Sequence, residues 1–319
     1  MHNFCFLLKS YSNDFALAKR LLLSLHAHNK DDIPVYISVP KSDYSMFREL
    51  AAPNVYLLMD EDICSELATS EVAGFSPGYI NQEIIKLSFW EQSRCKNYFC
   101  IDSDAVLIRD FYYSDFMYDE TTPYTPLVED SDLVSDPKYY ADYWQPREVS
   151  LRKIQKIFSI RQKKILTVHG NITFSCAVLK SLKEDFCAQH NFSYLDLITY
   201  SPYEFSWYTF WLQKNNIIPI HLSAPNIKYF HMPHHVYLSR LMGISEKDLA
   251  RGYVGYVVNS NFMYTLPSEE YEKIRPSDSL ARLVPFNILS RALMLRAILN
   301  IQHIFARSFK KVSSIVKGK

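Results

Sequence analysis

Glycine is scarce in this chain, with 7 residues among 319. None of them stands in a G-x-G-x-x-G or a G-x-x-x-x-G-K-[ST] spacing. Those two loops hold the phosphates of dinucleotides and nucleoside triphosphates on backbone N–H groups. The sequence therefore argues against a dinucleotide-binding Rossmann loop and against a P-loop.

Paired cysteines and long apolar segments are missing as well. The six cysteines form no C-x-x-C pair, and the first residues lack a secretory apolar segment followed by a small-residue cleavage site. No run reaches the roughly 18 uninterrupted apolar residues that a membrane-spanning helix needs. These absences predict free thiols and a cytoplasmic location.

A strong charge of one sign is also missing, because 35 basic and 34 acidic side chains leave a net charge of +1. That balance predicts no nucleic-acid partner. The charges are unevenly placed, however. Residues 280–319 contain eight Lys and Arg residues and no Asp or Glu, and the remainder has 27 basic against 34 acidic residues, a charge of −7.

Strand and helix patterns alternate along the first hundred residues. Apolar runs at 3–9, 34–40, 54–60 and 97–102 predict strands, and helical periodicity predicts helices over 16–26, 43–50 and 79–94. This order is typical of a parallel sheet with crossover helices. We therefore predict an α/β fold with a mainly parallel sheet flanked by helices.

The patterns are weaker after this region. Residues 121–152 are rich in acidic, aromatic and proline residues without clear periodicity, and they predict an irregular excursion that serves as a lid. A helix is expected over 202–216, a strand over 217–222, and a strand end or loop over 228–236.

Two carboxylates follow a buried-looking strand in the stretch Ile101-Asp102-Ser103-Asp104. Open α/β sheets bind their ligands at the carboxyl ends of the strands. Side chains two residues apart on an extended chain point the same way, so Asp102 and Asp104 can share one hard cation. We expect Mg²⁺ or Mn²⁺ here, bridged to a diphosphate.

Two chemistries compete for this motif. The metal stabilises the leaving nucleotide of a nucleotide sugar, or Asp102 is the nucleophile of a haloacid-dehalogenase-type phosphotransferase with Asp104 as its acid–base partner. The phosphotransferase motif normally lies on the first strand of its fold, whereas about a hundred residues precede it here. A non-catalytic, membrane-associated glycan-binding protein is a third interpretation.

Several segments resemble an uncharacterised bacterial family of GT-A-type glycosyltransferases from polysaccharide and lipopolysaccharide assembly loci. The likeness covers roughly residues 3–265, and its most specific part is the G-Y-I-N-Q-E-I-I-K-L helix coupled to I-D-S-D. The resemblance implies a GT-A-like (Rossmann-like) fold, a nucleotide-sugar donor and a divalent metal. Glu83 departs from it, because a second glutamine is expected there.

The resemblance also implies roles for individual residues. Donor-binding candidates are Lys9, Ser10, Tyr11, Asp14, Gln82, Lys86 and Ser103. His231 is the expected third metal ligand beside Asp102 and Asp104, because neutral imidazole binds Mn²⁺. A helix cap, a solvated helix face and a histidine-containing loop are the structural alternatives for these positions.

An inverting transferase needs a carboxylate that takes the proton of the acceptor hydroxyl. Glu204 is the candidate, since it begins an aromatic helix whose rings can stack on a sugar. The alternative is an acidic residue that complements the helix dipole. Asn171, Thr173 and Ser175 are candidates for lining the sugar pocket, and Ser260, Asn261 and Tyr264 for closing over donor or acceptor.

We therefore expect a transferase domain over residues 1–265 and a helical basic tail over 266–319. Apolar residues among widely spaced arginines in the tail predict an anchor to an anionic membrane surface. The alternative is a helix docked on the acidic body or on a second subunit. The anchor implies a peripheral location on the inner face of the cytoplasmic membrane, and a surface glycan or glycolipid as acceptor.

Overall fold

The computed structural model describes residues 1–128, 131–168 and 170–259, together with positions 286–287, 289–295, 297–298, 301–302 and 304–305. The chain divides into two compact units. The first unit comprises Met1–Lys228 and Tyr253–Val257, and the second comprises Tyr229–Gly252 and Val258–Lys319.

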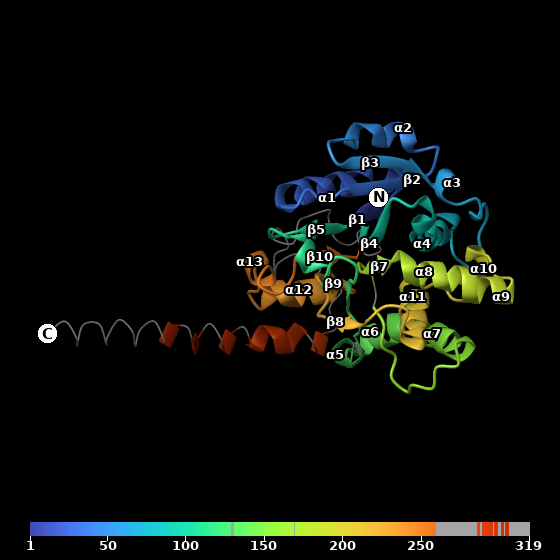
Figure 1. Ribbon diagram of the computed structural model, residues 1–319. Helices are drawn as coiled ribbons and strands as arrows, with labels where there is room; N and C mark the ends of the chain where they lie inside the picture. The colour runs from blue at the N-terminus through green and yellow to red at the C-terminus, as the bar shows by residue number, and fades with distance from the viewer. Residues whose placement is uncertain are drawn as a thin grey trace. The chain divides into compact units, whose positions relative to one another are not determined.

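A five-stranded sheet in the order β3-β2-β1-β4-β7 forms the centre of the first unit (Figure 1). The first four strands are mutually parallel, and only β7 runs antiparallel, beside β4. This sheet confirms the predicted α/β class. Its strands are β1 (His2–Lys9), β2 (Val35–Val39), β3 (Val55–Met59), β4 (Cys95–Asp102) and β7 (Thr173–Ser175).

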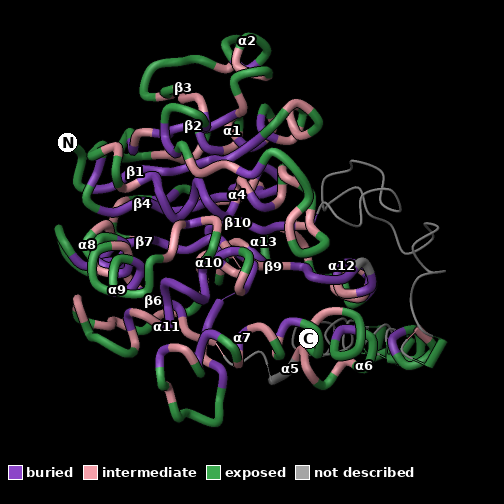
Figure 2. Tube along the Cα trace, turned by 90° about the vertical axis from the view of Figure 1, so that its right-hand side faces the viewer, coloured by how far each residue is buried: buried purple, intermediate pink, exposed green. Residues whose placement is uncertain are grey.

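The strand order reverses between β1 and β4. The chain moves outward from β1 to β2 and β3, and then returns to pair β4 with the other edge of β1. Lys9, the last residue of β1, stands in register with Asp102, the last residue of β4. Both strands are buried along most of their length (Figure 2). Such a reversal opens a crevice at the carboxyl ends of the two strands.

Helices connect these strands close to their predicted positions. Ser76 caps α4 by accepting a hydrogen bond from Tyr79 N, and Pro77 occupies the first turn, where its missing N–H costs nothing. The connecting elements are α1 (Phe15–His28), α2 (Tyr44–Phe47), α3 (Asp60–Ile63) and α4 (Pro77–Ser88), with the 3-10 turns η1 (Ser12–Asp14), η2 (Arg48–Leu50) and η3 (Phe89–Gln92).

The segment 121–152 is more regular than predicted. After the 3-10 turn η4 (Tyr113–Asp115) and β6 (Tyr124–Thr125) come α5 (Ser131–Val134), α6 (Pro137–Tyr139), the π-helix η5 (Tyr140–Trp144) and α7 (Gln145–Ile157). Leu151 and Ile154 of α7 are fully buried, so an apolar stripe fixes this helix against the first unit. The expectation of an irregular excursion was wrong here, while the lid role stays a prediction.

The rest of the first unit agrees with the elements predicted from the sequence except at one strand. The helix expected over 202–216 is α11 (Glu204–Asn215), whereas only His221 and Leu222 of the strand expected over 217–222 pair, forming β8 beside β6. Further helices are α8 (Cys176–Ser181), the π-helix η6 (Leu182–Cys187), α9 (Ala188–His190) and α10 (Tyr194–Tyr200). A small sheet has the order β5 (Ala105–Leu107), β10 (Gly255–Val258) and β9 (Ile227–Phe230).

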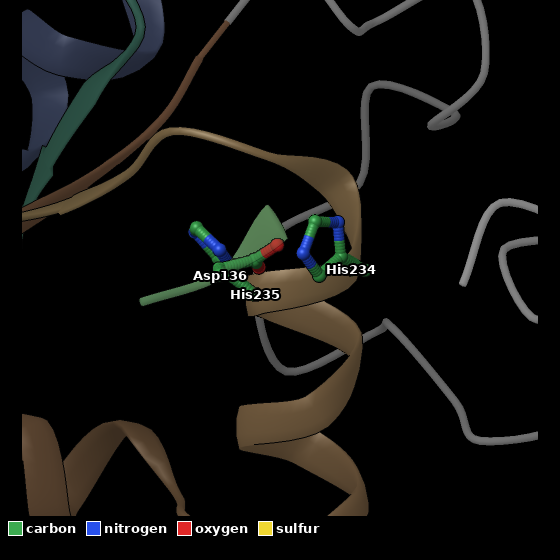
Figure 3. A group of neighbouring side chains, drawn as sticks. All are labelled: Asp136, His234 and His235. Carbon is green, nitrogen blue, oxygen red and sulfur yellow. The ribbon is translucent and has the colours of Figure 1, made fainter. Parts of the chain in front are cut away.

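The second unit contains α12 (Pro233–Leu241) and α13 (Glu246–Leu249). His234 and His235 lie in the first turn of α12, so these two histidines do not stand in the strand end or loop expected over 228–236 (Figure 3). The described positions between 286 and 305 are helical. The predicted boundary at 265 lies outside the described residues, as do Ser260, Asn261 and Tyr264. None of the described helices combines the length and the hydropathy needed to cross a membrane.

Candidate functional site

Charged side chains converge where the parallel strands of the first unit end. Lys9 and Asp102 close β1 and β4, and Asp60 follows β3 directly. The carboxyl ends of parallel strands meet at one edge of a sheet, so residues distant in sequence come together here. The candidate site is built on this edge.

Lys9 is buried in an ion pair with Asp60, whose Oδ2 lies 3.0 Å from Lys9 Nζ. Ser38 Oγ donates to Asp60 Oδ1 over 2.5 Å, and Lys9 Nζ donates to the carbonyl of Ser10 over 2.6 Å. Burial raises the pKa of the Asp60 carboxyl, and the nearby charge of Lys9 opposes that rise. Lys9 therefore braces the loop after β1 and is not a solvated lysine.

The loop after β1 is tied to the D-S-D turn. Ser103 Oγ donates to Asp14 Oδ2 over 2.8 Å, and burial raises the pKa of the Asp14 carboxyl against this hydrogen bond. Ser10 is buried, and its Oγ has no hydrogen-bond partner among the described residues, whereas Tyr11 is 42% exposed. The loop after β1 and the D-S-D turn are thus joined at the carboxyl ends of β1 and β4.

Asn171 holds Asp102 through both ends of its side-chain amide. Its Oδ1 accepts from Asp102 N over 3.0 Å, and its Nδ2 donates to Asp102 Oδ2 over 3.2 Å. Asn171 has a φ of 53°, in the left-handed region that asparagine tolerates better than most residues. This backbone position allows one side chain to orient the Asp102 carboxylate from two directions.

Lys86 of α4 lies between two carboxylates. Its Nζ is 3.0 Å from Asp102 Oδ1 and 3.0 Å from Glu204 Oε1, and its side chain is 3% exposed. Burial works against the charged ammonium, but attraction to Asp102 and Glu83 outweighs it and raises the Lys86 pKa. One cation therefore joins the end of β4 to the start of α11.

Glu204 is buried in the first turn of α11, after the N-cap residue Tyr203. Its backbone N–H donates to Glu83 Oε2 over 3.4 Å. Burial raises the pKa of Glu83 from 4.5 to about 8, and the charges of Lys86 and Arg147 hold it below a still higher value. The neutral carboxyl of Glu83 thus lies beside Glu204, whose own carboxyl group is paired with Lys86.

Asp104 is also buried, and its carbonyl accepts from Arg20 Nη2 over 3.2 Å. Within the described part of the first unit, no three His, Cys, Asp or Glu ligand atoms lie within 4.8 Å of one another. The two carboxylates of the D-S-D turn, Asp102 and Asp104, would hold a cation at this edge together with water. Mg²⁺ is commonly held in this way.

Comparison with known proteins gives a family for the chain. Residues 7–218 match a family described as of unknown function, DUF6492. The chain belongs to this family. No curated protein matches it.

Two solved structures of glycosyltransferases are similar to this chain. For mouse xyloside xylosyltransferase 1 in its apo form, the identity is 8%, the match covers 81% of this chain and 98% of that chain, and the TM-score is 0.45. For the apo structure of the WbbM bifunctional glycosyltransferase, the identity is 14%, the match covers 80% of this chain and 45% of that chain, and the TM-score is 0.44.

The DUF6492 chain brings several predicted residues together. Lys86, Asp102 and Glu204 form one ion-paired cluster, and Asp14 and Ser103 form a hydrogen-bonded pair. Gln82 is half-buried on α4, one turn before Lys86. His231 is buried in the second unit, between β9 and α12, and its role as a metal ligand stays a prediction.

Three residues of the candidate site were not predicted from the sequence. Asp60 and Ser38 surround Lys9, and Arg147 lies beside Tyr203. The position of Asp60 directly after the third strand was a usable signal, because it resembles the position of Asp102 at the end of the fourth strand. Nothing in the local sequence of Arg147 separates it from the other basic residues of α7.

Replacing Lys86 by methionine should destabilise the fold by about 3–5 kcal/mol, because the partly buried Asp102 and the buried Glu204 lose their shared cation. Urea denaturation of wild type and variant measures this change. The matched control is Lys180→Met, since Lys180 is 57% exposed in a loose pair with Glu184 and its loss should cost less than about 0.5 kcal/mol. Equal stability of Lys86→Met and wild type would contradict the ion-pair account.

Replacing Glu83 by glutamine should flatten the dependence of stability on pH. With a folded pKa of about 8 against 4.5, Glu83 keeps a proton that the unfolded chain releases in this interval. Wild-type stability therefore falls as pH rises between these values, by at most about 1.4 kcal/mol per pH unit. Glu83→Gln lacks this loss of stability. The free energy of unfolding of the variant should therefore increase relative to that of wild type from pH 5 to pH 8.

Urea denaturation at several pH values measures the effect of Glu83→Gln. The exposed Glu71→Gln is the control, and its curve should run parallel to wild type. Parallel curves for Glu83→Gln would show that Glu83 titrates as an ordinary carboxyl.

Proposed function

We propose that this protein is a metal-assisted glycosyltransferase that uses a nucleotide-sugar donor. The observation that carries the proposal is the Asp102–Lys86–Glu204 cluster at the β1–β4 reversal. The reversal is where open α/β sheets bind nucleotides. The cluster sets a carboxylate suited to a metal–diphosphate complex beside a second carboxylate, on another element, that is suited to proton transfer.

On the donor side, Asp102 and Asp104 would hold Mn²⁺ or Mg²⁺. The donor set fits such a cation, because both groups are carboxylates at the end of one strand and the Asp102 side chain is 18% exposed. When bound, the metal stabilises the negative charge that develops on the leaving nucleoside diphosphate. Lys86 and Asn171 fix the Asp102 carboxylate in place before the donor arrives.

Nucleoside and sugar contacts are assigned to the loop after β1 and to α4. In this proposal Ser10, Tyr11, Asp14 and Ser103 contact the donor from the loop after β1 and from the D-S-D turn, and Gln82 contacts it from α4. Lys9 contributes indirectly, by holding the loop through its own pair with Asp60 and the Ser10 carbonyl. In this proposal the exposed ring of Tyr11 stacks on the base.

On the acceptor side, Glu204 is the proposed base of an inverting reaction. The acceptor oxygen attacks the anomeric carbon opposite the diphosphate, the carbon–oxygen bond to the diphosphate breaks, and the acceptor proton passes to Glu204. The Lys86 ammonium favours the charged carboxylate, which is the form that accepts a proton.

The basic tail supports a lipid-linked or surface glycan acceptor at an anionic membrane. Its described helical positions expose large apolar side chains, with Phe286 84%, Ile304 64% and Phe305 61% exposed. Residues 280–319 combine such side chains with eight basic residues and no acid. That composition complements an anionic lipid surface, which attracts each basic residue by about 1 kcal/mol. We propose a peripheral location on the inner face of the cytoplasmic membrane.

The donor proposal predicts a metal-dependent rise in Tm with one of UDP, GDP, dTDP and CMP in the presence of Mn²⁺, because a ligand of the native state stabilises it by mass action. Asp102→Asn/Asp104→Asn should lose that rise, and the exposed Asp62→Asn should keep it. Thermal unfolding by fluorescence measures both. No rise with any nucleotide would reject the proposal, and phosphate release from phosphoesters would then favour the phosphotransferase.

The tail proposal predicts that the full chain floats with phosphatidylglycerol vesicles at low salt and less well at high salt. Ile301→Asp/Ile304→Asp should abolish flotation, because both side chains are exposed on the tail helix. Leu222→Asp, at a 69% exposed site of the first unit, should not. Absence of flotation at low salt would reject a lipid surface as partner, and self-association by mass photometry would identify a second copy instead.

A further inference from the structure

Arg147 is a buried cation that has no ion-pair partner among the described residues. The residue lies on α7 and is 3% exposed, yet none of the described carboxylates comes within 4.0 Å of its guanidinium. Its Nη1 donates to Tyr143 Oη over 3.0 Å and its Nη2 to the Val168 carbonyl over 2.7 Å. Its Nε is buried and has no hydrogen-bond partner among the described residues.

A buried charge that lacks a counter-ion is costly, so what surrounds Arg147 is informative. The guanidinium carbon lies 4.8 Å from the ring centre of Tyr203 and 5.9 Å from that of Tyr143, and both rings offer cation–π attraction. These contacts stabilise the cation but leave its charge in place. The site therefore carries a net positive charge that the described side chains do not neutralise.

Glu83 does not serve as the missing counter-ion. It feels the charge of Arg147, but no ion pair within 4.0 Å joins the two among the described residues. Burial raises the Glu83 pKa to about 8, so Glu83 is largely neutral at pH 7. Glu204, which begins α11, is already paired with Lys86.

Partly exposed tyrosines surround this cation. Tyr79, Tyr143 and Tyr203 are half-buried, Tyr79 Oη donates to the Pro202 carbonyl over 3.2 Å, and Phe75 stacks on Tyr79 with ring centres 4.9 Å apart. Tyrosine rings that show one face to solvent are stacking surfaces for sugars. Tyr203 immediately precedes Glu204, which places this frame on the acceptor side of the site.

We propose that Arg147, with Tyr143 and Tyr203, binds an anionic group of the acceptor, close to the hydroxyl that Glu204 deprotonates. The assignment to the acceptor rests on the proposed transferase function, whereas the anion site itself does not. A guanidinium binds carboxylate or phosphate through two parallel hydrogen bonds and is weakly hydrated, which suits a buried recognition site. The anionic oxygens belong either to an acidic sugar or to a lipid-linked phosphate.

Calorimetric titration of the full chain with three matched probes tests this inference. Glucose is neutral, glucuronate adds a carboxylate, and glucose 1-phosphate adds a phosphate. The donor site is filled beforehand with the nucleotide and Mn²⁺ that raise Tm, where one does. We expect at least one anionic probe to bind wild type about tenfold more tightly than glucose, and the better of the two to distinguish the acidic-sugar source from the phosphate source.

Arg147→Met should bind the preferred anion no better than glucose, and Arg147→Lys should fall between the two because it keeps the charge and loses the fork. Arg152→Met is the matched control, since Arg152 is a 41% exposed arginine of the same helix and should leave the titrations unchanged. If circular dichroism shows that Arg147→Met does not fold, the inference is tested by the titrations of Arg147→Lys and of wild type with the three probes.

Equal affinity of wild type for glucose and both anions, or no binding of either anion, would overturn the inference, as would full anion preference in Arg147→Met. The donor proposal fails separately, on the nucleotide-dependent Tm. Selective anion binding without any effect of nucleotides on Tm would support the Arg147 site and reject the transferase proposal. A nucleotide-dependent Tm without selective anion binding would support the transferase proposal and reject this site.

Discussion

The ammonium of Lys86, buried between Asp102 and Glu204, is the interaction on which the site depends. An isolated buried charge would be unstable, and here each charge compensates another. The two carboxylates come from elements about a hundred residues apart, so the lysine also fixes the end of β4 relative to the start of α11. Phe205, whose ring centre lies 4.8 Å from Lys86 Nζ, completes the enclosure. A single side chain thus sets the geometry between the proposed donor and acceptor sides.

Sheet topology explains why that lysine finds its partners. Because β4 returns to the free edge of β1, Lys9 and Asp102 end in register, and the loops that follow must diverge around a crevice. Two ion pairs then stand side by side at this edge, Lys9 with Asp60 and Lys86 with Asp102. The first braces the loop after β1 and the second braces the D-S-D turn, while Asp14 and Ser103 join the two segments.

Local patterns in the sequence predicted this sheet well, because alternating strands and helices leave few parallel topologies open. They also singled out Lys86, Asp102 and Glu204, although not the ion pairs that unite them, since those contacts span 16 and 118 positions. Segment 121–152 was misread because short helices and a π-helix, rich in aromatic and charged residues, blur the 3.6-residue period. Arg147 was missed for a different reason, because the tyrosines that surround it come from the π-helix η5 and from the residue before α11.

The balance of buried charge distinguishes the two sides of the site. On the strand side, Lys9 and Lys86 each have an ionic partner at 3.0 Å. Binding a nucleotide diphosphate there therefore requires further positive charge. A divalent cation on Asp102 and Asp104 would supply it. On the α7 side, Arg147 is positive with no described anion beside it. Since a fold keeps an uncompensated buried cation only at a cost, the imbalance is best explained by a negatively charged group that reaches Arg147 with the substrate.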